Sequence, residues 1–456
     1  MKLINKIILS FVVLLLLQHI SLTAQNSDNL FMNQQLLTDI FDKLYNLENS
    51  DSGKVNIVHV GDSHIQAGFF TDAIRRPLQE VFGNGGYGFV FPYSLVRTNG
   101  PRNVKYVTNV AWENQTNVRP WTNLDVGLSG IALYTSSDNY VLQLTAEDSF
   151  NKIKVIYPTE KPQVRLSTTV EPLKVSSTVS TNVKYHRIKS GETLSGISRK
   201  YGVTITQLKK ANNMRSDRIN AGKSLKIPSK TVAQVAPVIL DKNIECVALQ
   251  SVPYCSYYTS NTPLNRISIL PANEKISRYT LNGIALENDS KGVIYHSIGV
   301  NGAALKDYNK YPLFFKQLSV LEPDLVVISL GTNESFARMS PSEYMDEMQH
   351  FIANVLSQNQ NVSILVITPP PSILRRKRDN PYLSEFIPAL MSQDGFPVWN
   401  MFDRMGGIRG IQTGPYAQLV ARDKVHYTQQ GYEQQGFMFV SDFIDAYNNY
   451  KANKRK

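Results

Sequence analysis

Three residues have the types and spacing of a serine nucleophile with its base. Ser63 directly follows the β-branched run 54–60, which predicts a buried strand. A Ser on a tight turn after such a strand stands at the open edge of a parallel sheet, where ligands bind. Asp423 precedes His426 by three residues, so its carboxylate reaches the imidazole, fixes its tautomer and stabilises the imidazolium. The three residues therefore suit acyl chemistry.

Two further positions suit the stabilisation of negative charge on an oxygen. Asn333 follows the apolar run 325–330, and an amide at the end of a strand is a fixed donor for a developing oxyanion. Gly302 follows the run 293–298, and a residue without a side chain lets a backbone N–H approach the same oxygen. We therefore expect both groups at the edge of the sheet that carries Ser63.

These segments, in this order, resemble the four blocks of the SGNH or GDSL-like hydrolase family. Ser63 matches the first block, Gly302 the second, Asn333 the third, and Asp423 with His426 the last. The resemblance covers about 55–100 and 290–450 and implies a flavodoxin-like, three-layer α/β fold. It also implies a serine esterase whose oxyanion hole is formed by the N–H groups of Ser63 and Gly302 and the amide of Asn333. The first block reads GDSHIQ rather than the commoner GDSL form, which argues against a lipase-like preference.

A second motif occupies residues 185–228, where a strand, two short helices and a closing strand are expected. This plan resembles the LysM domain, at Tyr185, 190–194, Ile197, 201–202, Leu208, Asn212, Gly222 and 225–228. LysM modules bind glycans that contain N-acetylglucosamine, mainly peptidoglycan and chitin. By resemblance, the sugar contacts come from two loops, at Gly191, Glu192, Thr193, Leu194, Asn213, Met214, Arg218 and Ile219. A LysM fold without sugar binding is the alternative.

The remaining patterns indicate an α/β domain that is split by a long insertion. From 293 onward strands and helices alternate, which predicts a parallel sheet covered by helices. Segments rich in Val, Ile, Tyr and Thr predict an antiparallel, sandwich-like domain. The expected organisation is a signal peptide at 1–25, the hydrolase domain at 26–100 and 291–450, the β-rich domain at 101–182 and 231–290, the LysM domain at 183–230, and a basic tail at 451–456. Expected helices include 31–49, 71–82, 309–321, 341–357 and 429–449.

The layout also resembles that of some peptidoglycan O-acetylesterases, in which a carbohydrate-binding domain accompanies the hydrolase.

Four aromatic residues of the β-rich segments could stack on sugars, but we expect them in the core: Trp112, Trp121, Tyr134 and Tyr140. His64, next to Ser63, could support the triad residues, but it is interpreted first as a structural residue of the nucleophile loop. The basic run 375–378 either lies in a solvated loop or attracts an anionic substrate.

Two other kinds of site are not supported. Gly83, Gly85 and Gly88 have the spacing of a dinucleotide loop, but they follow a predicted helix rather than a strand. No HExxH motif or Cys/His cluster accompanies Asp423 and His426, so we expect neither a metal nor a cofactor.

The N-terminus predicts export. Lys2 and Lys6 precede the apolar run 7–17, and small and polar residues follow to Ala24, near which cleavage is expected. An uncleaved anchor is the alternative. No second apolar stretch has the length of a membrane span, so we expect a secreted or periplasmic protein without an integral span. Cys246 and Cys255 then either form a disulfide or remain thiols.

The net charge of +11 is concentrated in one segment. Residues 184–230 hold twelve basic and two acidic residues, and the tail 451–456 adds four basic residues. Without these and the two lysines of the signal peptide, the rest of the chain carries a net −5. A nucleic-acid partner is therefore not expected, and the basic LysM segment suits the anionic polymers of a bacterial envelope.

Together these features predict an exported carbohydrate esterase that is held on cell-wall glycan by its LysM domain. The favoured reaction removes O-acetyl groups from peptidoglycan or a related polysaccharide. One alternative is a glycan-binding protein without catalysis. The other is an O-acyltransferase, which would share the acyl-enzyme.

Overall fold

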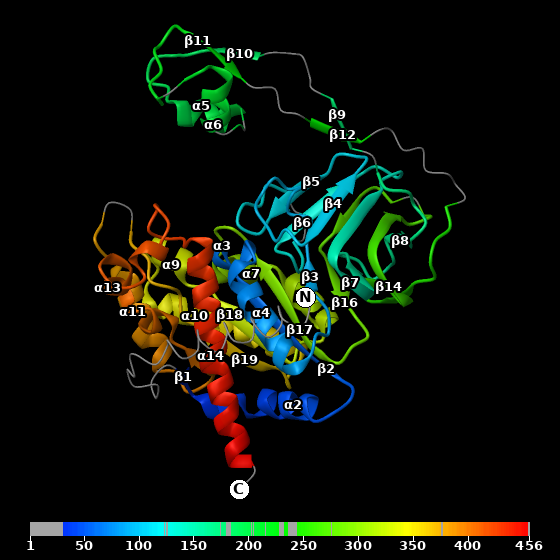
Figure 1. The fold of residues 1–456 in the computed structure, drawn as a ribbon, viewed down its shortest axis with the longest axis vertical. Helices are drawn as coiled ribbons and strands as arrows, with labels where there is room; N and C mark the ends of the chain where they lie inside the picture. The colour runs from blue at the N-terminus through cyan, green and yellow to red at the C-terminus, as the bar shows by residue number, and fades with distance from the viewer. Residues whose placement is uncertain are drawn as a thin grey trace, which may run out of the picture.

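The computed structural model describes residues 31–454, apart from 123, 125, 174, 179–183, 202, 204, 215, 228–231, 236–243, 275, 375 and 376. The expected signal peptide and the last two residues of the tail lie outside the described residues. Figure 1 shows a helix-covered sheet, a β-rich part beside it, and a small unit of two strands and two helices.

Six strands of the described chain form the α/β sheet, in the order β1 (Phe31–Met32), β20 (Val398–Trp399), β19 (Ser363–Ile367), β18 (Leu325–Ser329), β2 (Lys54–Gly61) and β17 (Gly292–Gly299). The strands β20 to β17 are parallel, and β1 pairs with β20 antiparallel. Strand β2 therefore lies between two strands that follow it by more than two hundred residues. Buried β-branched residues on both faces explain the near-continuous apolar runs of these strands.

Helices cover both faces of this sheet. The helices are α2 (Thr38–Glu48), α3 (Ser63–Gln66), α4 (Phe69–Phe82), α7 (Leu305–Asn309), α8 (Pro312–Leu318), α9 (Thr332–Phe336), α10 (Pro341–Gln358), α11 (Pro381–Met391), α12 (Met401–Arg404), α13 (Gly407–Gln412) and α14 (Gln429–Lys454), with 3-10 turns at Gln34–Leu37, Ser319–Leu321 and Ala417–Leu419. On one face Ile57 packs with Phe70 of α4 and Phe443 of α14. On the other, Val58 belongs to the core that contains Phe351 of α10. The expected three-layer α/β fold is confirmed.

Two expected helices differ from the structure. The segment 31–49 begins with the edge strand β1 and a 3-10 turn before α2 starts at Thr38. The segment 309–321 is divided, because α7 ends at Asn309 and Pro312 starts α8. Proline has no N–H to donate, so it suits the first turn of a helix and interrupts a continuous one.

The inserted β-rich part contains a seven-stranded antiparallel sheet. Its strands are β3 (Gly88–Val90), β4 (Val104–Thr108), β7 (Leu142–Ile156), β8 (Val164–Ser167), β13 (Gln250–Val252), β14 (Cys255–Pro271) and β16 (Gly283–Glu287). A smaller sheet has the strands β5 (Glu113–Thr116), β6 (Ile131–Thr135) and β15 (Tyr279–Leu281). The pairing of β7 with β14 joins both sides of the insertion, and β3 brings residues before 101 into the sheet.

The glycine-rich loop 83–88 connects the two parts of the fold. A Cβ atom on Gly86, whose φ is +133°, would lie 2.5 Å from Glu287 Cα, and one on Gly83 would lie 2.6 Å from the carbonyl oxygen of Lys291. The glycines thus allow the backbone to pass closely between α4 and β3. This close packing accounts for the glycine spacing without a nucleotide.

The LysM segment has a core of its own. Strands β10 (Lys184–Arg187) and β11 (Ser224–Ile227) pair antiparallel beside α5 (Leu194–Tyr201) and α6 (Ile205–Ala211). The core residues are Ile188, Leu194, Ile197, Leu208, Leu225 and Ile227. On the flanks, β9 (Val175–Thr178) and β12 (Val232–Val235) pair antiparallel, with Thr178 opposite Val232. The chain therefore leaves for this unit and returns from it at the same place.

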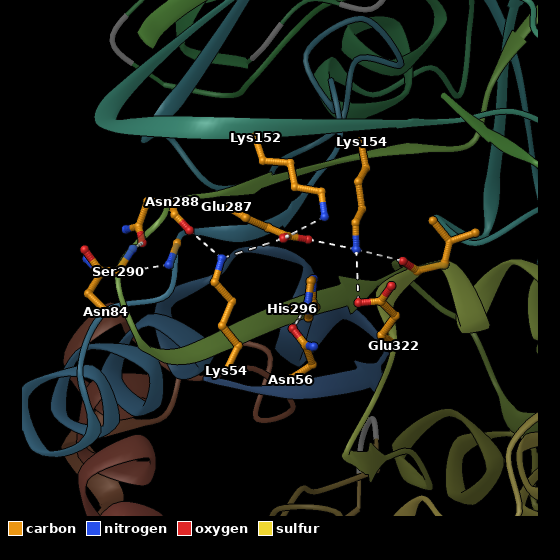
Figure 2. A network of polar contacts seen from close by, with 12 residues as sticks. Lys54, Asn56, Asn84, Lys152, Lys154, Glu287, Asn288, Ser290, His296 and Glu322 are labelled. Carbon is orange, nitrogen blue, oxygen red and sulfur yellow. Dashed lines mark hydrogen bonds and ion pairs between the residues drawn. The ribbon is translucent and has the colours of Figure 1, made fainter. Parts of the chain in front are cut away.

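A charge network centred on the buried residues Lys154 and Glu287 joins the β-rich sheet to the α/β sheet (Figure 2). Lys154 Nζ lies 2.9 Å from Glu287 Oε1 and 3.7 Å from Glu322 Oε2. Lys152 and Lys54 lie 3.6 and 3.9 Å from Glu287 Oε2. Because Lys54 belongs to β2 and Glu287 to β16, the network spans the boundary between the two sheets.

The two cysteines and the helices bear on the expected thiol state and on the expected absence of a membrane span. Cys246 and Cys255 are free thiols, and burial raises the pKa of Cys255 to about 12. Over the residues that the structure describes, no helix is long and apolar enough to cross a membrane.

Candidate active site

Ser63 begins the short helix α3 at the end of β2. Asp62 caps this helix, because its Oδ1 accepts a hydrogen bond from the N–H of His64 at 2.9 Å. A Cβ atom on Gly61 would lie 2.8 Å from the carbonyl oxygen of Ser329, so only glycine fits before the turn. The strand end and the cap together fix the position of Ser63.

Ser63, His426 and Asp423 form a continuous hydrogen-bonded chain. Ser63 Oγ lies 2.9 Å from His426 Nε2, and His426 Nδ1 lies 2.7 Å from Asp423 Oδ2. A carboxylate accepts only, so Nδ1 carries the proton and Nε2 is left to accept the proton of the hydroxyl. This is the tautomer that a general base requires.

The carboxylate of Asp423 is held by its own loop. Its Oδ1 accepts hydrogen bonds from the N–H groups of Val425 and His426, both at 3.0 Å. Desolvation raises the pKa of Asp423, but the hydrogen bonds from the His426 side chain and from these N–H groups outweigh it and lower the pKa below its ordinary value. Asp423 is therefore ionised when it orients His426.

The two other oxyanion positions lie beside Ser63. Gly302 has a φ of +84° and lies on the exposed loop after β17. In the described part of the chain, the N–H groups of Ser63 and Gly302 donate to no other atom of the protein. Asn333 Nδ2 donates to Asp62 Oδ2 at 3.0 Å and to the carbonyl oxygen of Ala303 at 2.9 Å. A new oxyanion would therefore have to share one of the two Asn333 hydrogens.

Two buried carboxyl groups support this arrangement and were not singled out from the sequence. Desolvation raises the pKa of Asp62 to about 7, although the N–H of His64 lowers it. Desolvation also raises the pKa of Glu334 to about 7, although its hydrogen bond from the N–H of Leu305, at 2.7 Å, lowers it. Their burial shows only in the folded chain, so no local pattern reveals them.

His64 packs against His426. Its ring centroid lies 5.4 Å from that of His426, and its Nδ1 lies 3.0 Å from the hydroxyl of Tyr432. Burial lowers the pKa of His64 to about 3, so this ring is neutral beside His426. His64 thus lies in direct contact with His426 and is held there by Tyr432.

Ser63 and His426 open onto a cleft of about 680 Å³. Its lining comes from segments on both sides of the insertion: Ser63, Ala67, Phe69, Asn99, Asn301, Gly302, Thr332, Asn333, Phe336, Val425, His426, Tyr427 and Tyr432. The structure thus brings together the predicted residues Ser63, Gly302, Asn333 and His426. Asp423 stands behind His426. Nowhere in the described chain do three His, Cys, Asp or Glu side chains meet as ligands for a metal ion.

The LysM loops hold the predicted glycan-binding residues in different states of exposure. Thr193 Oγ1 accepts from the N–H of Gly196 at 3.1 Å and so caps α5, and Glu192 Oε2 is bound to His186 Nε2 at 2.7 Å. Leu194 is 2% exposed and belongs to the core, so its side chain is not free for a sugar. Gly191, Asn213 and Arg218 are exposed, and Met214 and Ile219 are half-buried against the core.

The expectation that the four aromatic residues lie in the core is correct for three of them. Tyr134 and Tyr140 are buried, and Trp112 packs edge-on against Tyr140 with ring centroids 5.1 Å apart. For Trp121 it is wrong, because this residue is 62% exposed in the loop after β5. In the basic run, Lys377 and Arg378 are exposed, and residues 375 and 376 lie outside the described residues.

Comparisons with known proteins agree with both motifs. Residues 275–434 match the model of the GDSL-like Lipase/Acylhydrolase family, and residues 186–228 match that of the LysM domain. The chain carries a GDSL-like hydrolase region and a LysM domain. The two resemblances seen in the sequence are therefore confirmed. The matched GDSL-like region includes Gly302, Asn333, Asp423 and His426, whereas Ser63 lies before it.

A solved structure extends the likeness of the fold to nearly the whole chain. It is titled a peptidoglycan O-acetylesterase in action, is 19% identical, and covers 90% of this chain and 96% of its own, with a TM-score of 0.58. At this identity the likeness concerns the fold alone.

The curated relatives match shorter stretches. The N-acetylmuramoyl-L-alanine amidase sle1 of Staphylococcus saprophyticus is 32% identical over 114 residues, which is 24% of this chain and 34% of the relative. The cell wall-binding protein YocH of Bacillus subtilis is 41% identical over 63 residues, which is 14% of this chain and 22% of the relative. The chain thus spans about a third or less of these relatives.

Proposed function

We propose that the protein is a serine esterase. The observation that carries this proposal is the chain of hydrogen bonds from Ser63 through His426 to Asp423, at 2.9 and 2.7 Å, which opens onto the cleft. As Ser63 Oγ attacks the ester carbonyl, its proton passes to His426 Nε2. His426 then returns the proton to the leaving alcohol. Water, activated by the same base, releases the carboxylic acid from Ser63.

The oxyanion of each tetrahedral intermediate would be bound by backbone and side-chain donors. The N–H groups of Ser63 and Gly302 have no other acceptor in the described chain, and Asn333 supplies a third donor by sharing a hydrogen. His426 is 40% exposed at its side chain, so water has direct access to the base. This access supports the second, hydrolytic step.

The substrate that best fits the whole chain is an acylated cell-wall glycan, with O-acetyl groups of peptidoglycan first. The LysM domain supports a glycan partner, and the likeness in fold to a peptidoglycan O-acetylesterase supports the acetyl ester. Removal of an acetyl group from a polymer outside the cytoplasm requires export, in agreement with the N-terminal pattern at 1–25. We therefore propose that the protein acts in the cell envelope.

Acetate release tests the reaction. Wild type should release acetate from O-acetylated peptidoglycan, and Ser63→Ala should lower kcat by at least about 10³-fold. Ser357→Ala, on the exposed face of α10, is the matched control and should behave as wild type. Activity on simple acetyl esters without release from peptidoglycan would reject the substrate. Inactivity on every ester would reject the esterase and favour a glycan-binding protein. Acetylation of an added oligosaccharide would indicate an acyltransferase.

A deletion tests the LysM tether separately. Because Thr178 and Val232 lie opposite each other, a short Gly-Ser link can replace residues 179–231 without stretching the β9–β12 pair. The deletion should lower binding to insoluble peptidoglycan and leave turnover of a soluble acetyl ester intact. Unchanged binding would reject the tether.

A further inference from the structure

A hydrogen-bond network outside the triad lies at the rim of the cleft. It joins α3, the loop 91–101 and the loop after β17. Gln66 Oε1 accepts from the N–H of Asn301 at 2.7 Å, and Gln66 Nε2 donates to the carbonyl oxygen of Asn99 at 2.6 Å. Asn301 Nδ2 donates to Asn99 Oδ1 at 2.7 Å and to Thr98 Oγ1 at 3.0 Å. Asn99 and Asn301 also line the cleft together with Ser63.

The backbone fixes the direction of each amide in this network. A backbone N–H faces one end of the Gln66 amide and a carbonyl oxygen faces the other, so its Oε1 and Nε2 cannot be exchanged. Gln66 Nε2 also faces the inner atom of the Asn99 amide at 3.2 Å, so that atom is the oxygen. The atom of Asn301 that faces Asn99 Oδ1 is then the nitrogen.

This orientation leaves one donor and one acceptor directed away from the network. Among the residues that the structure describes, Asn99 Nδ2 and Asn301 Oδ1 have no hydrogen-bond partner in the protein. Both residues are exposed, whereas Gln66 is 2% exposed beneath them. A hydroxyl group both accepts and donates, so two hydroxyls of one sugar ring match this pair.

Buried residues hold this hydrogen-bond network in place. The buried Tyr93 donates to the carbonyl oxygen of Gly299 at 3.1 Å, which ties the loop 91–101 to the end of β17. Gln66 lies in the same short helix as Ser63. The donor and the acceptor therefore keep a constant position relative to the nucleophile, and little ordering is needed when a ligand binds.

We propose that Asn99 Nδ2 and Asn301 Oδ1 form a subsite for the hydroxyl groups of the sugar that carries the ester. This inference rests on the proposed esterase and adds the residues that recognise the alcohol side of its substrate. Asn99 donates to one hydroxyl, and a second hydroxyl donates to Asn301. Gln66 is a positioning residue, because it acts through these two amides.

Two matched esters test the subsite. The first is the methyl glycoside of 6-O-acetyl-N-acetylglucosamine, and the second is the same compound with methyl ethers at O3 and O4. The ratio of their kcat/KM values should be about tenfold or more in wild type, since ethers cannot donate. In Asn301→Leu the ratio should fall toward one. In Asn99→Leu kcat/KM should instead fall for both esters, because an ether oxygen still accepts from Asn99 in wild type. Asn449→Leu, on the exposed end of α14, is the matched control and should keep the wild-type ratio.

Each result separates this inference from the esterase itself. A ratio near one in wild type would overturn the subsite even though Ser63-dependent acetate release continued. A high ratio that persists in Asn301→Leu would mean that the methyl groups clash sterically, and it would also overturn the subsite. Acetate release from both esters that survives Ser63→Ala would instead refute the proposed function. Because the ratio is measured within each variant, a general loss of activity does not affect it.

Discussion

Asp62 Oδ2 accepts a hydrogen bond from Asn333 Nδ2 at 3.0 Å, which holds the Asn333 amide beside the nucleophile. The residue before Ser63 thus sets the direction of a donor that lies 271 positions later in the chain. Glu334, next to Asn333, brings a second buried carboxyl group to the same place. The first and third motif blocks therefore form one structural unit.

Asp62→Asn should lower kcat with little change in KM. The new amide would keep the hydrogen bond from the N–H of His64, so its nitrogen would face Asn333 Nδ2 and two donors would meet. We expect a loss of about 10²-fold, the typical size for removal of one oxyanion donor. Steady-state kinetics on a soluble acetyl ester would measure it. Asp346→Asn, exposed on α10, is the control. Additive losses in Asp62→Asn with Asn333→Ala would contradict a shared role.

Asp423→Asn should impair the base without unfolding the chain. The oxygen of the new amide would still accept from the backbone N–H groups, but its nitrogen would face His426 Nδ1 and favour the wrong tautomer. We expect kcat to fall by about 10²- to 10⁴-fold, and circular dichroism should remain that of wild type. Because Asp423 is 52% exposed at its side chain, the free energy of unfolding should change little. A variant with full activity would show that His426 needs no carboxylate.

Glu334→Gln should make the free energy of unfolding less sensitive to pH. The folded-state pKa of Glu334 is raised to about 7 from an ordinary value of 4.5. Between these values the native state binds more protons than the unfolded state, so stability falls as pH rises through this window. The variant should therefore gain about 2 kcal/mol relative to wild type between pH 5 and pH 8. Urea unfolding at both pH values measures this, and a constant difference would contradict the raised pKa.

Glu287→Ala should be strongly destabilising. It leaves Lys154, which is 5% exposed at its side chain, without its nearest partner at the boundary between the sheets. Breaking such a buried pair costs about 3–5 kcal/mol, whereas Glu287→Leu with Lys154→Met should cost much less. Lys43→Ala, which breaks the partly exposed pair with Asp324, is a control for ion-pair loss. Equal losses for the single and double variants would show that the charges do not interact.

The sequence predicted the triad because its signals are local. Ser63 follows a β-branched run, and three residues separate Asp423 from His426, so both patterns can be read in a short window. The parallel sheet was predicted because apolar strand segments alternate with helical segments along the chain. Strand β1 has only two residues, which is too short for an alternating pattern of apolar and polar residues. Its pairing with β20 therefore could not be predicted from its own sequence.

The supporting residues of the site depend on tertiary contacts. Gln66 and Asn301 lie 235 positions apart, and neither is unusual in its own segment. Likewise, the raised pKa of Asp62 results from burial, which appears only when the strands are assembled. The exposure of Trp121 was missed because a tryptophan between β-like segments is typical of a core.

The position of β2 also sets the order in which the molecule folds. Strand β2 ends at Gly61, but its neighbours β17 and β18 begin at Gly292 and Leu325. During synthesis β2 therefore cannot pair with its neighbours until most of the chain has been made. The contacts of the LysM unit all lie within 184–227, so this unit can fold earlier. His426 is made still later. Ser63 and His426 can therefore come together only after almost the whole chain has been made.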